Sequence, residues 1–148
     1  AEIGGSDVSI GVAADVSDED AVQAMVDTAV LAFGGLDLVV NNADRKGGHV
    51  LVAPDATVWG VDHGVSFHVD PKLRTVLWGW SGRPFTDVEQ EVLRRLGQGL
   101  RADLGEGLSA LLSPDEIAAT TARVDGLLAS GRFPEPPTGR VPIPWPPF

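Results

Sequence analysis

The chain has 148 residues, no cysteine, and a formal net charge of −10 from 11 Lys and Arg against 21 Asp and Glu. The lack of thiols excludes disulfides and thiolate metal sites, and the acidic balance argues against a nucleic-acid partner and favours a basic protein partner. No apolar run approaches the roughly 20 residues that cross a bilayer, so we expect no membrane span and a cytoplasmic location.

The first part of the chain is typical of a β-α-β unit. Residues 8–13 form a short apolar run that predicts a buried strand. Ser17 is a good N-cap for the helix that should follow, and Gly34-Gly35 would end that helix. The apolar run 36–40 then predicts a second strand, parallel to the first.

A polar loop and a hairpin come next. Residues 44–48 are polar and glycine-rich, which is typical of a loop. Residues 49–53 and 58–62 predict two strands on either side of a turn at residues 54–57.

The rest of the chain predicts helices and then a proline-rich tail. Thr86 and Glu89 form a capping box for one helix, whose apolar stripe would be Val88, Val92, Leu96 and Leu100. Ser113-Pro114-Asp115-Glu116 begins a second helix that should run to Ser130 and stop at Gly131. The tail, residues 132–148, contains seven of the 11 prolines and cannot be helix or central strand. The predicted fold class is therefore α/β to α+β.

Two stretches near the N-terminus resemble the short-chain dehydrogenase/reductase family. They are Ala14-Asp15-Val16-Ser17 and the run from Phe33 to Ala43, which ends in Asn41-Asn42-Ala43. The resemblance implies that Asp15-Val16 lies beside the adenine of NAD(P) and that the asparagines end a strand under the cofactor. The glycine-rich pyrophosphate turn and the catalytic tyrosine of that family are missing, so we expect no NAD(P) binding and no dehydrogenase chemistry.

From about residue 37 onward the chain resembles actinobacterial proteins similar to the phosphatidylinositol 3- and 4-kinases. Residues 41–49, 61–64 and 73–78 carry this resemblance, together with the Pro-Trp-Pro-Pro ending at residues 144–147. It implies Mg²⁺ and ATP as cofactors. Phosphoryl transfer depends on positioning and charge neutralisation more than on covalent help.

The kinase resemblance assigns one role to each of five residues. Asp44 would be the catalytic carboxylate that orients the acceptor hydroxyl. His49 and Asp62, 13 residues apart across the predicted hairpin, would be metal ligands. Arg45 and Lys46 would contact phosphate. No lysine precedes Lys46, so the phosphate-pairing lysine of a kinase N-lobe is missing and intact catalysis is not expected.

These resemblances predict two joined parts, as in a chimera of natural or designed origin. Residues 1–43 would be a dehydrogenase-like fragment, and residues 44–148 a kinase-like fragment. The predicted function is a phosphotransferase remnant with weak Mg²⁺ and ATP binding. Three alternatives stay open: an NAD(P)-binding fragment without catalysis, a non-enzymatic acidic interaction or inhibitor protein resembling an antitoxin, and a zinc site of His49, His63 and His68.

Overall fold

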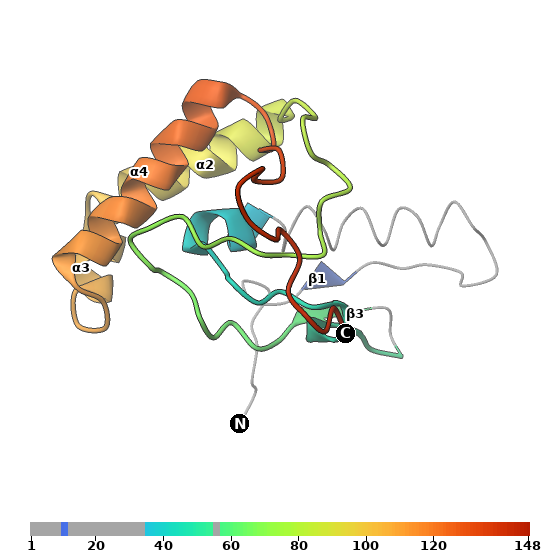
Figure 1. Cartoon of the computed structure of the whole chain (residues 1–148). Coiled ribbons are helices and arrows are strands. Elements are labelled where there is room, and N and C mark those ends of the chain that lie inside the picture. Colours follow the sequence, from blue (N-terminus) through green and yellow to red (C-terminus); the bar gives the residue numbers. More distant parts are fainter. Residues whose placement is uncertain (1–9, 12–34, 55–56) are drawn as a thin grey trace.

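The computed structural model describes residues 10–11, 35–54 and 57–148, and these form an α+β arrangement. Within them a small antiparallel sheet lies beside a layer of helices (Figure 1). The helix predicted after Ser17 and the residues Asp15-Val16 lie outside the described residues. None of the helices that are described is long and apolar enough to cross a membrane.

The sheet has three strands in the order β1-β3-β2. Strand β2 (Val50–Val52) pairs antiparallel with β3 (Thr57–Gly60), with Val50 opposite Gly60, so the predicted hairpin is confirmed. Strand β1 (Ile10–Gly11) also pairs antiparallel with β3. The predicted parallel partner for residues 8–13 is therefore wrong, because β1 adds to the edge of the hairpin.

The segment predicted as the second strand is helical over residues 35–40. Short apolar runs fit a strand or a buried helix equally well, and tertiary contacts decide between them. Here Val39 and Val40 are buried while Leu36 is 42% exposed, so the burial follows one helical face. The β-α-β prediction is thus wrong at its second strand.

The two main helices begin where the capping signals predict. Helix α2 (Asp87–Leu100) starts at Thr86 with a complete Thr86–Glu89 capping box. Helix α4 (Pro114–Ser130) starts at Ser113 with a second capping box, and it ends at Gly131, whose φ of 63° suits glycine. A short helix, α3 (Asp103–Leu108), connects them.

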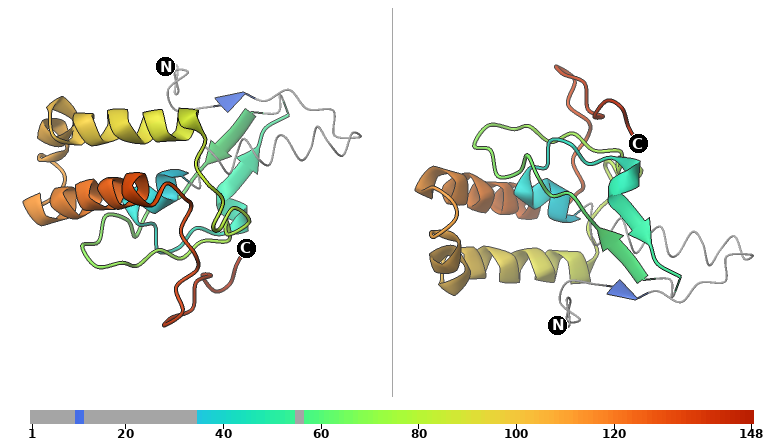
Figure 2. Two further views of the ribbon diagram at one scale, coloured as in Figure 1. Left: turned by 90° about the horizontal axis from the view of Figure 1, so that it is seen from above. Right: turned by 90° about the horizontal axis from the view of Figure 1, so that it is seen from below.

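The buried face of α2 differs from the predicted stripe. Val88 and Val92 are 73% and 57% exposed, whereas Leu93, Gly97 and Leu100 are buried. Helix α4 lies along this face (Figure 2). A Cβ built on Gly97 would come within 3.4 Å of Val124 Cγ1, so the absence of a side chain at Gly97 lets the two helices approach. Spacing by four residues predicted the helix correctly; Leu96 and Leu100 of the predicted stripe do contribute to the core, whereas Val88 and Val92 do not.

One apolar core joins the helical layer to the segment 35–40 and to the start of the tail. Phe85 and Phe133 meet edge to face, with ring centroids 4.7 Å apart. The core cluster consists of Val39, Phe85, Leu93, Leu100, Val124 and Phe133.

The tail from residue 133 onward contains neither helix nor strand, as predicted. It lies along the body of the protein and is held by backbone contacts. The carbonyl of Pro142 accepts hydrogen bonds from Thr75 N and Trp78 Nε1, and the carbonyl of Pro147 accepts one from Gly47 N.

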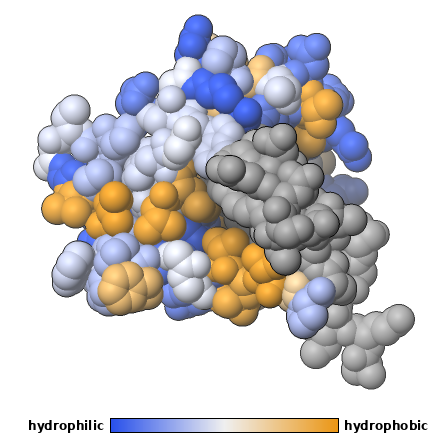
Figure 3. Space-filling view, turned by 90° about the vertical axis from the view of Figure 1, so that its right-hand side faces the viewer, coloured by the Kyte–Doolittle hydropathy of each residue, from blue (hydrophilic) through white to orange (hydrophobic). Residues whose placement is uncertain are grey.

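Figure 3 shows one face of the molecule, on which hydrophobic residues lie in patches among polar ones.

Candidate metal and nucleotide site

A fully buried polar centre lies under the base of the hairpin. Asp37 and Arg45 are both 0% exposed, and Arg45 Nε lies 3.0 Å from Asp37 Oδ2. Asn42 Nδ2 donates to the same carboxylate at 3.1 Å. Burial raises the pKa of the Asp37 carboxyl, and the hydrogen bonds and charge of Arg45 oppose that shift.

Arg45 does not take the predicted role of a phosphate contact. Its Nη1 donates to the carbonyls of Val61 at 2.6 Å and His49 at 3.4 Å, and its Nη2 lies 2.7 Å from His63 Nδ1. With Nε directed at Asp37, all three guanidinium nitrogens point into the protein. Arg45 therefore clamps the two ends of the hairpin together, and no part of it is exposed to a ligand.

Asn41 and Asn42 also have structural roles. Asn41 has a φ of 57° and is 2% exposed. Its Nδ2 donates to the carbonyls of His68 and Asp70, and its Oδ1 accepts from Lys72 N, each at 2.8 Å. This one amide therefore fixes the loop 68–72 against the helical segment.

The hairpin brings His49 and Asp62 together. His49 ends the 3-10 helix η1 (Gly47–His49) just before β2, and Asp62 follows β3. The carbonyl of His49 accepts from Val61 N at 2.9 Å, which extends the ladder by one step. As a result His49 Nε2 lies 3.5 Å from Asp62 Oδ2, with the two side chains 16% and 61% exposed.

Asp44 lies on the same polar loop but has a different partner. Its Oδ2 is 3.3 Å from Lys46 Nζ, and its side chain is 33% exposed. Its backbone N–H donates to Asn42 Oδ1, closing a tight turn. Lys46 thus neutralises the carboxylate that the sequence assigned to catalysis.

Among the residues that the structure describes, no three His, Asp or Glu side chains gather closely enough to hold a metal together. His49 and Asp62 lie 3.5 Å apart without a third such side chain beside them among these residues. The three histidines of the zinc alternative are separate, since His63 bonds to Arg45 and His68 pairs with Asp70 at 3.9 Å. The structure gives that alternative no support.

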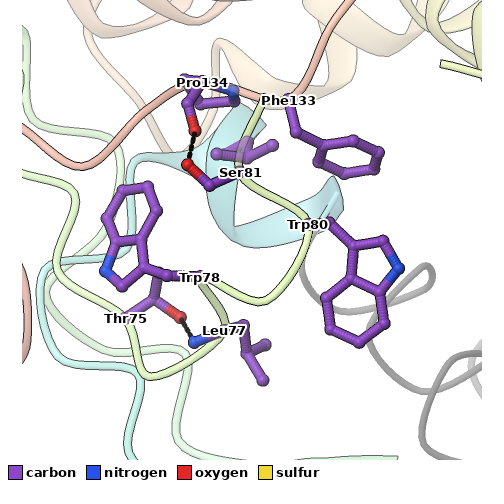
Figure 4. A pocket seen from close by; sticks show the side chains of 8 residues that line it. Thr75, Leu77, Trp78, Trp80, Ser81, Phe133 and Pro134 are labelled. Carbon is purple, nitrogen blue, oxygen red and sulfur yellow. Dashed lines mark hydrogen bonds between the residues drawn. The ribbon is translucent and has the colours of Figure 1, made fainter. Parts of the chain in front are cut away.

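Two hollows lie away from the hairpin. The smaller has a volume of about 20 Å³, room for about one water molecule. Figure 4 shows Trp78, Trp80 and Phe133 around it, with Ser81 Oγ donating to the carbonyl of Pro134 at 3.3 Å. The larger is an open cleft of about 560 Å³ beside α4.

The fold and the site define an α+β chain with a polar loop and a hairpin that pairs one imidazole with one carboxylate. Over 112 residues, 76% of its length, the chain is 46% identical to Protein Rv2133c of Mycobacterium tuberculosis. That match covers 40% of the relative, so the chain spans about two fifths of its length. No family model and no solved structure matches the chain.

Short N-terminal stretches match other mycobacterial proteins. Forty residues, 27% of the chain, are 62% identical to Uncharacterized oxidoreductase Rv0769 of M. tuberculosis, covering 16% of that protein. Forty-one residues, 28% of the chain, are 51% identical to Uncharacterized oxidoreductase Mb1385 of Mycobacterium bovis, covering 17% of it. These matches support a dehydrogenase-like sequence near the N-terminus.

The predicted membership of the C-terminal part in a phosphatidylinositol kinase-like family is wrong. The match that extends over three quarters of the chain is to Protein Rv2133c, and no kinase-like family is found. The dinucleotide alternative also loses its structural premise, because residues 35–40 are helical where a cofactor-bearing strand was expected.

Proposed function

We propose that the chain binds a divalent cation, Mg²⁺, weakly through His49 and Asp62, together with the phosphates of a nucleotide such as ATP. It would act as a remnant of a phosphotransferase without intact catalysis. The distance of 3.5 Å between His49 Nε2 and Asp62 Oδ2 supports this proposal. The alternative of an acidic interaction protein stays a prediction based on the net charge.

The ligand set is consistent with a low-affinity site. Mg²⁺ keeps several of its waters and is commonly held by one or two carboxylates plus substrate phosphates. The carboxylate of Asp62 is 61% exposed and so accessible to a hydrated ion. Imidazole is a poorer ligand for Mg²⁺ than oxygen is, so His49 favours weak binding and does not exclude Mn²⁺.

Two features argue against intact catalysis. The guanidinium of Arg45 is directed at protein groups, and Asp44 is paired with Lys46. Phosphoryl transfer requires cations that neutralise the transferring group and a carboxylate free to orient the acceptor. In this structure the guanidinium of Arg45 is occupied by protein groups, and the carboxylate of Asp44 is occupied by Lys46.

A titration of the full chain by two-dimensional NMR tests the proposal. Mn²⁺ should broaden the amide signals around His49 and Asp62 selectively, and Mg²⁺ with ATP should shift them. Asp62→Asn should abolish both effects. Asp70→Asn is the matched control, because Asp70 belongs to a second exposed His–Asp pair, with His68, and should leave them unchanged. A spectrum unaltered at millimolar ion and nucleotide, from folded protein, would refute the proposal.

A further inference from the structure

A cleft of about 560 Å³ lies between helix α4 and the loop that precedes residue 75. Val69, Pro71 and Leu73 form its wall on the loop, and Ala122, Gly126 and Leu127 form its wall on α4. Figures 1 and 2 show this loop running beside α4. The volume is within the range of about 300–1,000 Å³ that is typical of small-molecule sites, and the lining is mainly apolar, as such sites usually are.

The charged residues that line the cleft have one sign. The chain contains 21 acidic and 11 basic residues, yet the charged residues lining this cleft are Arg123 and Arg132, with no carboxylate among them. An anionic ligand would therefore meet no opposing carboxylate on these walls.

The two arginines differ in how they are held. Arg123 Nε donates to the carbonyl of Val39 at 2.8 Å and Nη1 to that of His68 at 3.2 Å, so this guanidinium is fixed at the junction of three segments. Burial lowers the pKa of Arg123, which still leaves an arginine protonated at neutral pH. Arg132 is exposed, and its Nη1 donates to the carbonyl of Gly82. Arg132 thus offers a cation where the cleft meets solvent.

We propose that this cleft binds an amphipathic monocarboxylate, an aliphatic chain of medium length that ends in one carboxylate. The apolar walls would bury the chain, and the fork of Arg132 would pair with the carboxylate in the planar geometry that guanidinium and carboxylate share. The cleft contains none of Asp44, His49 or Asp62, so the proposal does not depend on metal binding.

The geometry at Gly126 provides a direct test. A Cβ built there meets no atom within 4 Å, so the backbone position accepts a side chain, and Gly126→Leu would place that side chain at the wall of the cleft. Leucine also favours helix over glycine, so α4 should still form. Gly107 in α3 is the matched control, because it is also exposed and helical with open space at its Cβ, and it does not line the cleft.

Calorimetric titration of the full chain with decanoate, below its micelle-forming concentration, should show binding at one site. Decanol and decyltrimethylammonium have the same tail with no charge or a positive charge, and they should bind at least tenfold more weakly. Gly126→Leu should abolish decanoate binding and Gly107→Leu should leave it unchanged. Arg132→Gln should weaken decanoate at least fivefold while leaving decanol unaffected.

Three results would overturn the proposal. The first is an absence of decanoate binding by the folded protein. The second is equal affinity for the anionic and cationic ligands, which would show general adsorption to apolar surface. The third is unaltered decanoate affinity in Gly126→Leu, which would place the ligand elsewhere on the molecule. Because these titrations contain no metal or nucleotide, their outcome is separate from that of the Mn²⁺ experiment.

Discussion

Replacing Arg45 with leucine should destabilise the fold strongly, because it removes the central donor of the buried polar centre. Arg45 pairs with Asp37 through Nε and reaches the carbonyls of Val61 and His49 and the ring of His63 through its other nitrogens. Both members of the ion pair are 0% exposed. Leucine fills part of the space but leaves the Asp37 carboxylate and the Val61 carbonyl without this donor.

The expected loss follows from the desolvation of the remaining partner. Removing one member of a buried ion pair typically costs about 3–5 kcal/mol, because it leaves an uncompensated charge in the interior. The free energy of unfolding of a natural domain is only about 5–15 kcal/mol. We therefore expect Arg45→Leu to lower the free energy of unfolding by about 3 kcal/mol or more and to leave a marginal fold.

The pH dependence gives an independent check on the cause. Burial raises the pKa of Asp37 and Arg45 opposes the shift, so without Arg45 the folded state should take up a proton more readily than the unfolded chain does. A group whose pKa is raised by folding contributes stability that increases as the pH falls toward the pKa of the unfolded state. The deficit of Arg45→Leu should therefore shrink between pH 7 and pH 5.

Urea denaturation followed by tryptophan fluorescence measures these differences. The double variant Asp37→Leu, Arg45→Leu removes both charges. Its loss in free energy of unfolding should be smaller, by about 2 kcal/mol or more, than the sum of the losses in the two single variants. A single-variant loss under about 1 kcal/mol, or additivity of the two single variants, would refute the argument that the pair stabilises the fold through mutual neutralisation.

Four further outcomes concern the helical layer. Ser113→Ala should lower the free energy of unfolding by about 1 kcal/mol in the same assay, through loss of the α4 cap. Hydrogen bonds from Ser113 lower the pKa of the Glu116 carboxyl in the folded state. The stability that the ionised carboxylate contributes is therefore present above the unfolded pKa of 4.5 and is lost as the pH falls through the lower folded pKa. Glu116→Gln lacks this contribution, so its stability should fall less steeply than that of the parent protein below pH 4.5. Gly105→Ala should destabilise the protein, because the new Cβ would lie against the last carbonyl of α2. Gly126→Ala has open space at its Cβ, so it should raise the free energy of unfolding by about 0.5–1 kcal/mol and the thermal midpoint with it.

The sequence predicted best where one local interaction determines the structure. Both capping boxes, the αL glycine at Gly131 and the β2–β3 hairpin are set by a few neighbouring residues, and the structure contains each of them. The approach of His49 to Asp62 also follows from the hairpin register, since a turn between two short strands returns the chain to its starting point.

The errors concern features that distant residues decide. The run 36–40 is apolar enough for a strand, but Asp37 within it finds Asn42 and Arg45 only when the chain is helical there and then turns. The inner face of α2 depends on Gly97, where α4 packs closely, and a search for bulky apolar residues passes over a glycine. The kinase resemblance placed Arg45 against phosphate, whereas its partners Asp37, Val61 and His63 come together around it only in the folded chain.

The buried contacts of Arg45 and the pair of His49 with Asp62 are linked by geometry, so loss of the fold and loss of the proposed ion binding can be told apart. Arg45 holds the carbonyls of His49 and Val61, so it fixes the backbone on both sides of the pair that His49 makes with Asp62. Loss of Arg45 should therefore weaken both the fold and the Mn²⁺ response. Asp62 is 61% exposed and has no part in the clamp, so Asp62→Asn should remove the Mn²⁺ response at nearly constant stability. A stable Arg45→Leu protein with a weakened response would show that the arginine positions the pair without being needed for the stability of the fold, since a guanidinium has no acceptor atom for a cation.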